Sequence, residues 1–322
     1  MAKDVGKTIY TVGNITKDVY LRLDARARKT YADERNVPWL SLPFDGSVQY
    51  YRGRKSVLGG SAVSTDVFKR FGLNPLVAGA RLKFKNEYDL SAESELGAVY
   101  RYILVSGDQP AVFAPSDSEL TFWEMPIEPP GVIYLDRACQ LNLRQRGDIV
   151  KYLKEHQRVG LALWANSGTL KLPDYTDSLG GVEMVFVDVR DLGLPASEES
   201  AIKTVKKFHK LGTETVVVVD GGDIYASNKK QLLKVSWALD EHEQRNLFTG
   251  LTTDSLIGAS FLGGYVLNRP LHECLLLAKY GVENADLEAA RTIGWLSGRI
   301  AGKQHEVKIW QDTPQTNPDQ TE

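Results

Sequence analysis

Short, continuously apolar runs alternate with amphipathic stretches through most of this 322-residue chain. A run without a polar face suits a strand of a parallel sheet that is covered on both faces. The amphipathic stretches between the runs, such as Val63, Val67 and Phe71 before Gly72, are typical of helices that pack on such a sheet. Repeated strand–helix–strand units predict an α/β fold with a doubly wound, mostly parallel sheet. The candidate core strands are residues 8–13, 76–79, 132–135, 159–164, 184–189 and 216–219.

Two stretches depart from this rhythm. Residues 17–57 contain alternating polar and apolar positions with no clear helix, and residues 99–114 have the pattern of a β-hairpin. Alternation means that one face of a strand is buried and the other exposed. We therefore expect these two stretches to form a small sheet, a lid over one edge of the main domain. Because no linker divides the chain, residues 1–311 are expected to form a single domain, followed by a disordered Pro/Gln/Asn/Thr-rich tail at 312–322.

Composition and charge narrow the classes of protein. The hydrophobic content of 43% and the charged content of 25% are typical of a soluble globular protein. A net charge of −2 gives no electrostatic reason to expect nucleic acid or an anionic membrane as partner. Cys139 and Cys274 lie far apart in apolar surroundings, which favours reduced thiols and a cytoplasmic location. No segment approaches the roughly 20 apolar residues of a membrane span.

Polar and glycine-rich segments follow the first predicted strand and precede the first predicted helix. Asp18, two residues after Thr16, would lie at the carboxyl edge of the sheet, where a carboxylate can accept hydrogen bonds from two substrate hydroxyls. The alternative is a turn aspartate that caps the strand. The pair Gly59-Gly60 leads towards Ser64 on the helix, and paired glycines let a backbone approach a ligand closely. The alternative here is an ordinary Gly-Gly turn with Ser61 as the N-cap.

The middle of the chain offers weaker candidates. Asn166 follows one predicted strand, and Asp188 and Asp191 follow the next. Two carboxylates three residues apart could hold a hydrated Mg²⁺, which prefers oxygen ligands, or they could form a surface turn with an N-cap aspartate. Gly221 lies in a Val-Val-Asp-Gly-Gly-Asp segment that fits either a phosphate-binding loop or a hairpin turn between two strands.

A glycine-rich segment near the C-terminus gives the sequence a family resemblance. Residues 258–264 read Gly-Ala-Ser-Phe-Leu-Gly-Gly, which resembles the final signature of the PfkB/ribokinase carbohydrate kinases, G-A-G-D-S-F-x-x-G. In this alignment Ala259 replaces the catalytic aspartate, and Leu256 and Ile257 replace glycine and alanine. The opening G-x-I-x-x-D, the Gly-Gly segment, the small split sheet and the later D-x-x-D occur in the family's order. Together they extend the resemblance over residues 8–305.

The resemblance implies a fold, a chemistry and a set of site residues. It implies a three-layer α/β core with a β-sheet lid, a sugar or nucleoside as substrate, ATP and Mg²⁺ as cofactors if the chain is active, and a homodimer formed through the lid. The residues that it assigns are Thr16, Asp18, Gly59, Gly60 and Ser64 to the substrate; Asn166, Asp188, Asp191 and Gly221 to the nucleotide; Asp188 and Asp191 to the metal; and Gly258 and Ala259 to catalysis.

Three hypotheses of function follow. Loss of a general base lowers a rate by about 10²–10⁴-fold, so Ala259 predicts a pseudokinase that still binds a sugar or nucleoside. The second hypothesis is an active phosphotransferase in which Asp254 is the base in a different alignment of Thr252-Thr253-Asp254-Ser255. The third is a structural assembly subunit with neither cofactor nor ligand.

Overall fold

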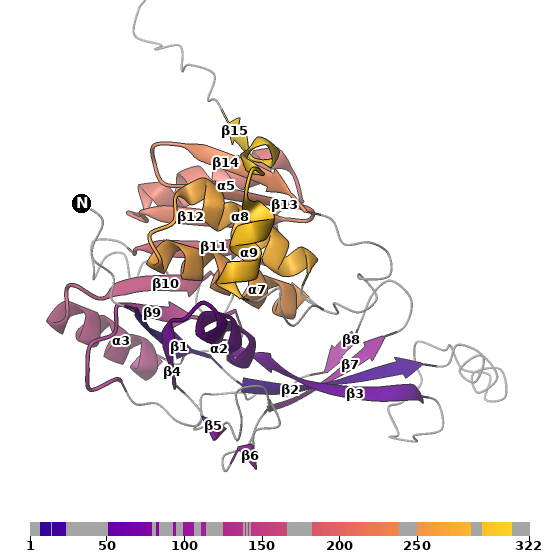
Figure 1. The fold of residues 1–322 in the computed structure, drawn as a ribbon. Helices are drawn as coiled ribbons and strands as arrows, with labels where there is room; N and C mark the ends of the chain where they lie inside the picture. The colour runs from indigo at the N-terminus through magenta and orange to yellow at the C-terminus, as the bar shows by residue number, and fades with distance from the viewer. Residues whose placement is uncertain are drawn as a thin grey trace, which may run out of the picture.

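A nine-stranded mixed sheet forms the centre of the computed structural model (Figure 1), in the order β15-β14-β13-β12-β11-β10-β9-β1-β4. The strands from β4 to β12 in this order are parallel, and β13, β14 and β15 complete one side as antiparallel strands. The predicted doubly wound, mostly parallel α/β sheet is therefore confirmed. The strands are β1 (Thr8–Val12), β4 (Asn74–Ala78), β9 (Val132–Leu135), β10 (Gly160–Trp164), β11 (Met184–Asp188), β12 (Thr215–Asp220), β13 (Asp223–Ser227), β14 (Leu232–Ser236) and β15 (Lys308–Trp310).

The structure describes most of this core and part of the periphery. The described residues are 7–13, 15–23, 51–78, 82–83, 93–94, 99–105, 111–113, 125–137, 139, 141, 143–165, 182–237, 250–284 and 292–310. The predicted tail at 312–322 lies outside them, and so does Asn166. The extent of the single domain, 1–311, stays a prediction.

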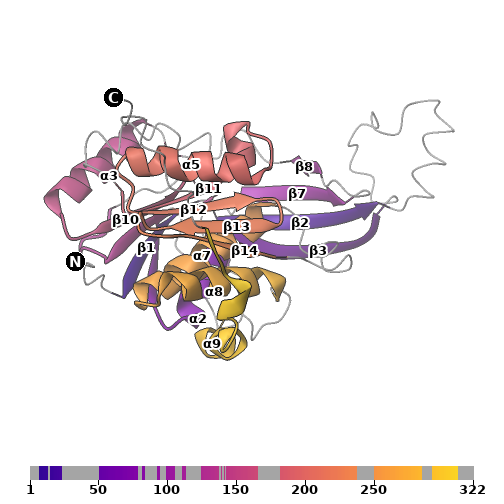
Figure 2. The ribbon, with the colours of Figure 1, turned by 90° about the horizontal axis from the view of Figure 1, so that it is seen from above.

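Helices cover both faces of the sheet and make three layers (Figure 2). One face carries α3 (Leu143–Glu155) and α5 (Glu198–Lys210); the other carries α2 (Ser61–Arg70), α7 (Gly250–Val266), α8 (Leu271–Glu283) and α9 (Ile293–Ile300). Two separate apolar clusters result, one between each helical layer and the sheet. The strands β9, β10 and β11 are buried along their whole length, and apart from Asp188 at the end of β11 their residues are apolar, as strands covered on both faces require.

Local sequence signals explain where individual helices begin and end. The Ser197 side chain accepts a hydrogen bond of 3.2 Å from the backbone N–H of Ser200 and so caps α5. Acidic residues occupy the first turn of α5 and basic residues its last turn, which complements the helix dipole. A 3₁₀ turn, η3 (Val189–Leu192), follows β11 directly, and η5 (Gln304–Glu306) precedes β15. No helix in the described part of the chain combines the length and the apolarity needed to cross a bilayer.

A second, four-stranded sheet extends from one end of the core, in the order β3-β2-β7-β8 (Figure 1). It consists of β2 (Ile15–Leu23), β3 (Tyr51–Gly60), β7 (Val99–Val105) and β8 (Ala111–Phe113), and a separate short pair is formed by β5 (Leu82–Lys83) and β6 (Glu93–Ser94). The predicted small sheet is therefore present, and β7 and β8 form the predicted hairpin. The homodimer contact predicted for this sheet stays a prediction.

Candidate active site at the carboxyl edge of the sheet

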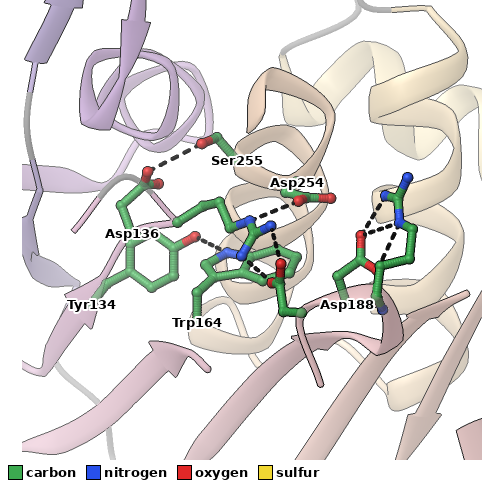
Figure 3. Close-up of polar contacts among 9 residues, drawn as sticks. Tyr134, Asp136, Trp164, Asp188, Asp254 and Ser255 are labelled. Carbon is green, nitrogen blue, oxygen red and sulfur yellow. Dashed lines mark hydrogen bonds and ion pairs between the residues drawn. The ribbon is translucent and has the colours of Figure 1, made fainter. Parts of the chain in front are cut away.

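Polar side chains from several elements meet at the carboxyl edge of the parallel strands, and Figure 3 shows Asp136, Asp188 and Asp254 among them. Asp136 directly follows β9, Asp188 ends β11, Ser64 lies on α2, and Asp254 lies near the beginning of α7. Open α/β sheets bind their ligands at this edge, because the loops that follow the strands leave a crevice there. These side chains are almost completely buried, so their polar atoms have to find partners within the protein.

Asp136 is held between two serines from different helices. The Ser64 hydroxyl donates to Asp136 Oδ2, and the Ser255 hydroxyl donates to Asp136 Oδ1 at 3.1 Å. The neighbouring Ser61 hydroxyl donates to the carbonyl of Gly13 at 2.8 Å and ties the start of α2 to the end of β1. Each oxygen of Asp136 therefore accepts a hydrogen bond from a serine hydroxyl. Asp136 was not among the predicted site residues, although its position directly after a predicted core strand marks it as an edge residue.

Arg137 joins two carboxylates that the sequence analysis had named separately. Its Nε donates to Asp254 Oδ2 at 2.9 Å, and its terminal nitrogens donate to both oxygens of Asp191, one of them at 2.8 Å. The guanidinium carbon lies 5.8 Å from the centre of the Trp164 ring. Burial acts to lower the pKa of Arg137, but the charges of Asp254 and Asp191 outweigh it and raise that pKa. Arg137 is therefore a permanent cation in this site.

Asp254 is the titratable carboxylate of the site. Burial, which disfavours the charged form, raises the pKa of Asp254 to about 7. Arg137 and Arg190 act to lower this pKa, and the negative charges of Asp188 and Asp191 act to raise it. A carboxylate with a pKa near neutrality can accept and release a proton under ordinary cellular conditions.

Asp188 and Asp191 lie at the two ends of η3 and each bonds to an arginine. Asp188 accepts a hydrogen bond of 2.8 Å from the backbone N–H of Arg190, so it is the N-cap that the alternative interpretation proposed. The Arg190 side chain also donates to both Asp188 oxygens. Unlike Arg137, which is 13% exposed, the Arg190 side chain is 60% exposed. Arg190 therefore stays in contact with water while its guanidinium group bonds the buried carboxylate of Asp188.

Ala259 lies inside α7, about 7.5 Å further along the helix axis than Asp254. It is 0% exposed and belongs to the apolar cluster between the sheet and its helices, together with Leu256 and Ile257. A β-carbon on Gly258 would lie 2.4 Å from the Tyr134 hydroxyl and 2.6 Å from Trp164 Nε1. The structure therefore places Gly258 and Ala259 in the helix–sheet contact, while Asp254 is the α7 carboxylate that lies at the edge.

The final glycines of the same segment also serve helix packing. A β-carbon on Gly263 would lie 2.4 Å from the Phe71 ring beyond the end of α2, and one on Gly264 would lie 2.7 Å from Leu277 of α8. Phe261 packs edge-on against Phe186 of β11, with ring centroids 6.0 Å apart. Small residues at these positions let α2 and α8 approach α7 closely.

The predicted substrate residues Thr16, Asp18 and Gly59 lie on strands of the second sheet. Thr16 and Asp18 lie on β2, where they pair with Gly59 and Val57 of β3, and their side chains lie outside the described part of the structure. Gly59 and Gly60 continue β3 directly into α2, with Gly60 as the N-cap at φ 61°. The alternative of a Gly-Gly turn capped by Ser61 is therefore wrong, because the glycines belong to a strand.

The predicted nucleotide residue Gly221 lies in a tight turn. Asp220 of β12 pairs with Asp223 of β13, so Gly221 and Gly222 form the two-residue connection of a β-hairpin. Gly221 is exposed and has a φ of 57°, which favours glycine. The hairpin interpretation is thus confirmed, whereas a role in nucleotide binding stays a prediction.

The residues at this edge suit a nucleotide phosphate but not a directly coordinated metal ion. The first turn of a helix carries backbone N–H groups without intrahelical partners, so the first turn of α7, beside Asp254, suits a phosphate group. Direct metal binding by Asp188 and Asp191 does not fit, because arginine nitrogens already bond both oxygens of each. Among the described residues, no group of three or more His, Cys, Asp and Glu side chains is placed to hold a metal ion.

Solved structures resemble this chain over nearly its whole length, although no protein-family model matches the sequence and no curated protein matches it. Ribokinase from Arabidopsis thaliana, complexed with ribose and ATP, superposes with a TM-score of 0.62 at 14% identity, covering 89% of this chain and 96% of that one. A nucleoside kinase of Methanocaldococcus jannaschii, an archaeal member of the ribokinase family, gives 0.60 at 12% identity, covering 92% and 98%.

A third solved structure agrees with these two. Ribokinase from Cryptococcus neoformans in complex with ADP gives a TM-score of 0.59 at 12% identity, covering 91% of this chain and 99% of that one. At such low identities the similarity establishes the architecture and leaves the chemistry to the site residues. The three-layer core, the second sheet and these superpositions together show that this chain has the fold of ribokinase and the PfkB carbohydrate kinases.

Proposed function

We propose that this chain is a kinase that transfers a phosphoryl group from ATP to a hydroxyl of a sugar or nucleoside, with Asp254 as its general base. The observation that carries the proposal is the placement of Asp254, a buried carboxylate near the beginning of α7, at the same edge as Asp136. The pKa of Asp254, raised by burial to about 7, supports it, because a general base works best near the operating pH.

Asp136 is the proposed anchor of the site. Ser64 and Ser255 each donate to one of its oxygens, so this fully buried carboxylate ties α2 and the beginning of α7 to the end of β9. Backbone N–H groups in the first turn of α7 are the proposed partners of the transferred phosphoryl group, whose negative charge they would stabilise. In the transfer, Asp254 takes the proton of the accepting hydroxyl while Arg137 holds the carboxylate in place.

A second candidate function is ligand binding without phosphoryl transfer. One observation favours it: Asp254 is 2% exposed at its side chain and is already engaged by Arg137. A base must reach the hydroxyl proton either directly or through one water. If the Arg137–Asp254 ion pair persists when a ligand is bound, the chain would bind a sugar or nucleoside and leave it unchanged.

A substrate screen separates the two candidates. ATP consumption is measured with a panel of sugars and nucleosides, and the thermal midpoint is recorded with each compound. For any compound that is phosphorylated, Asp254→Asn should lower the rate by about 10²–10⁴-fold with little change in the thermal shift. The matched control is Glu155→Gln, which alters an exposed carboxylate on α3 at the other face of the sheet and should leave the rate unchanged.

Each outcome has a definite meaning. Turnover that depends on Asp254 supports the kinase, whereas turnover that survives Asp254→Asn rejects Asp254 as its base. Thermal shifts without turnover reject the kinase and favour the binding protein. Neither shifts nor turnover with any compound would reject both and leave the structural subunit as the remaining hypothesis.

A further inference from the structure

The two carboxylates that resemble a magnesium site are already neutralised by the chain's own arginines. Arg137 donates to both oxygens of Asp191, and Arg190 donates to both oxygens of Asp188. Mg²⁺ demands near-octahedral oxygen ligands at short distance, and it would have to displace a guanidinium group to coordinate either of these carboxylates directly.

The charges around η3 also argue against a metal ion bound by Asp188 and Asp191. We call Arg137, Asp188, Arg190, Asp191 and Asp254 the arginine–aspartate cluster. Its three aspartates and two arginines leave a net charge of only −1 when all are ionised. Without the arginines, the same three carboxylates would repel one another and attract a divalent cation.

Arg137 contributes more to this neutralisation than Arg190. Its side chain is 13% exposed, it bridges Asp191 of η3 to Asp254 of α7, and it lies over the ring of Trp164. Three directed N–H bonds to two carboxylates use the planar geometry that distinguishes arginine from a simple point charge. Arg190, which is 60% exposed, only closes the N-terminal end of η3.

We propose that Arg137, assisted by Arg190, takes the place of a protein-bound divalent cation at this edge. The inference rests on the proposed function only in that both concern the same site. It implies that the chain itself does not bind a divalent metal through Asp188 and Asp191. A metal ion that accompanies a nucleotide would be held by the phosphates and not by these carboxylates.

The test is a titration of the full chain with Mn²⁺ in the absence of sugar and nucleotide. The electron paramagnetic resonance signal of free Mn²⁺ measures how much of the metal stays unbound at each step. The native protein should take up no Mn²⁺ at concentrations up to about 10⁻³ M, the weak end of protein sites for hard divalent cations. Arg137→Met, which removes the charge and keeps an unbranched apolar side chain, should bind Mn²⁺ at least about tenfold more tightly, because Asp191 and Asp254 lose their shared cation.

Two results would overturn the proposal. One is uptake by the native protein that Asp191→Asn abolishes, since that would make Asp191 a metal ligand in the presence of Arg137. The other is a folded Arg137→Met variant that gains no Mn²⁺ binding. If Arg137→Met does not fold, the native protein and Asp191→Asn decide the question alone. Because no substrate is present, failure here is distinct from an absence of kinase turnover.

Discussion

The two parts of α7 have opposite chemistry although both are buried. Near its beginning, Asp254 and Ser255 point to partners at the carboxyl edge, Arg137 and Asp136 respectively. From Leu256 onwards the same helix presents apolar and very small side chains to the sheet and to α2 and α8. The first part can hold and move a proton, whereas the second part can only pack.

This difference explains how a functional signature and a packing motif can be confused. Glycines and a following phenylalanine suit a tight phosphate-binding turn, but they equally suit a helix that is crossed closely by its neighbours. In this chain Gly263 and Gly264 lie against Phe71 and Leu277, at distances that leave no room for a β-carbon. The catalytic loss inferred from Ala259 stays a prediction, and its only basis is a sequence alignment that places an apolar core position in the site.

The largest effect that tests the difference between the two parts of α7 is expected for the substitution Ala259→Asp. If Ala259 occupied the catalytic position, the variant would regain a base and gain turnover. Since Ala259 is 0% exposed in an apolar cluster, we expect an unpaired buried charge that lowers the free energy of unfolding by about 3–5 kcal/mol. Urea unfolding followed by circular dichroism measures the change. Turnover gained by a stably folded Ala259→Asp variant would contradict the placement of Ala259 in the apolar contact between α7 and the sheet.

Ala301→Asp is the matched control for that variant. Ala301 is exposed just beyond α9, so the same substitution there adds a solvated charge. Its effect on the free energy of unfolding should stay within about 0.5 kcal/mol. A similar loss in both variants would mean that the damage does not come from burial at position 259.

The pH dependence of stability tests the polar part of α7. Burial raises the pKa of Asp254 to about 7 in the folded chain, against an opposing effect of Arg137, while an unfolded aspartate titrates near about 3.9. Between these values the folded state binds more protons than the unfolded state. Asp254 therefore makes stability fall as the pH rises from about 4 to about 7, by at most about 1.4 kcal/mol per pH unit for one proton.

The difference between the native protein and Asp254→Asn isolates this contribution. Both are unfolded in urea at several pH values across that interval, and the native protein should lose stability relative to the variant as the pH rises. Asp188, Asp191, Arg137 and Arg190, which face Asp254, are present in both proteins. Parallel curves for the two proteins would show that the pKa of Asp254 is not raised by folding.

The architecture was predictable because burial leaves a mark on local sequence. A strand such as β9, covered on both faces, is apolar at every position, and the antiparallel pairing of β7 with β8 confirms the hairpin that the sequence of residues 99–114 predicted. The hairpin at Gly221 was also predictable, because the Gly-Gly pair between two strands allowed either a hairpin turn or a phosphate-binding loop.

The candidate site was less predictable because its contacts are remote in sequence. Arg137 and Asp254 are 117 residues apart, and Ser64 and Asp136 are 72 apart. No local pattern marks such pairs; they follow only from the order of the strands. Asp136 could still have been noticed, since it directly follows a predicted core strand, and a residue there lies at the ligand-binding edge of a parallel sheet.

The smallest predicted change in the free energy of unfolding concerns the packing part of α7. It is tested by comparing the variants Gly258→Ala and Gly294→Ala. A β-carbon at Gly258 meets the Tyr134 hydroxyl and Trp164 Nε1, which are fully buried and hydrogen-bonded to each other at 2.9 Å, so neither ring can move away cheaply. Gly258→Ala should therefore destabilise the chain by about 1–3 kcal/mol.

Gly294 lies in α9 with nothing within 4 Å of its β-carbon position, so Gly294→Ala should stabilise by up to about 1 kcal/mol through helix propensity. Urea midpoints that move in opposite directions support close packing at Gly258, whereas a stabilising Gly258→Ala would mean that α7 stands further from β9 and β10 and that Ala259 could be nearer the edge.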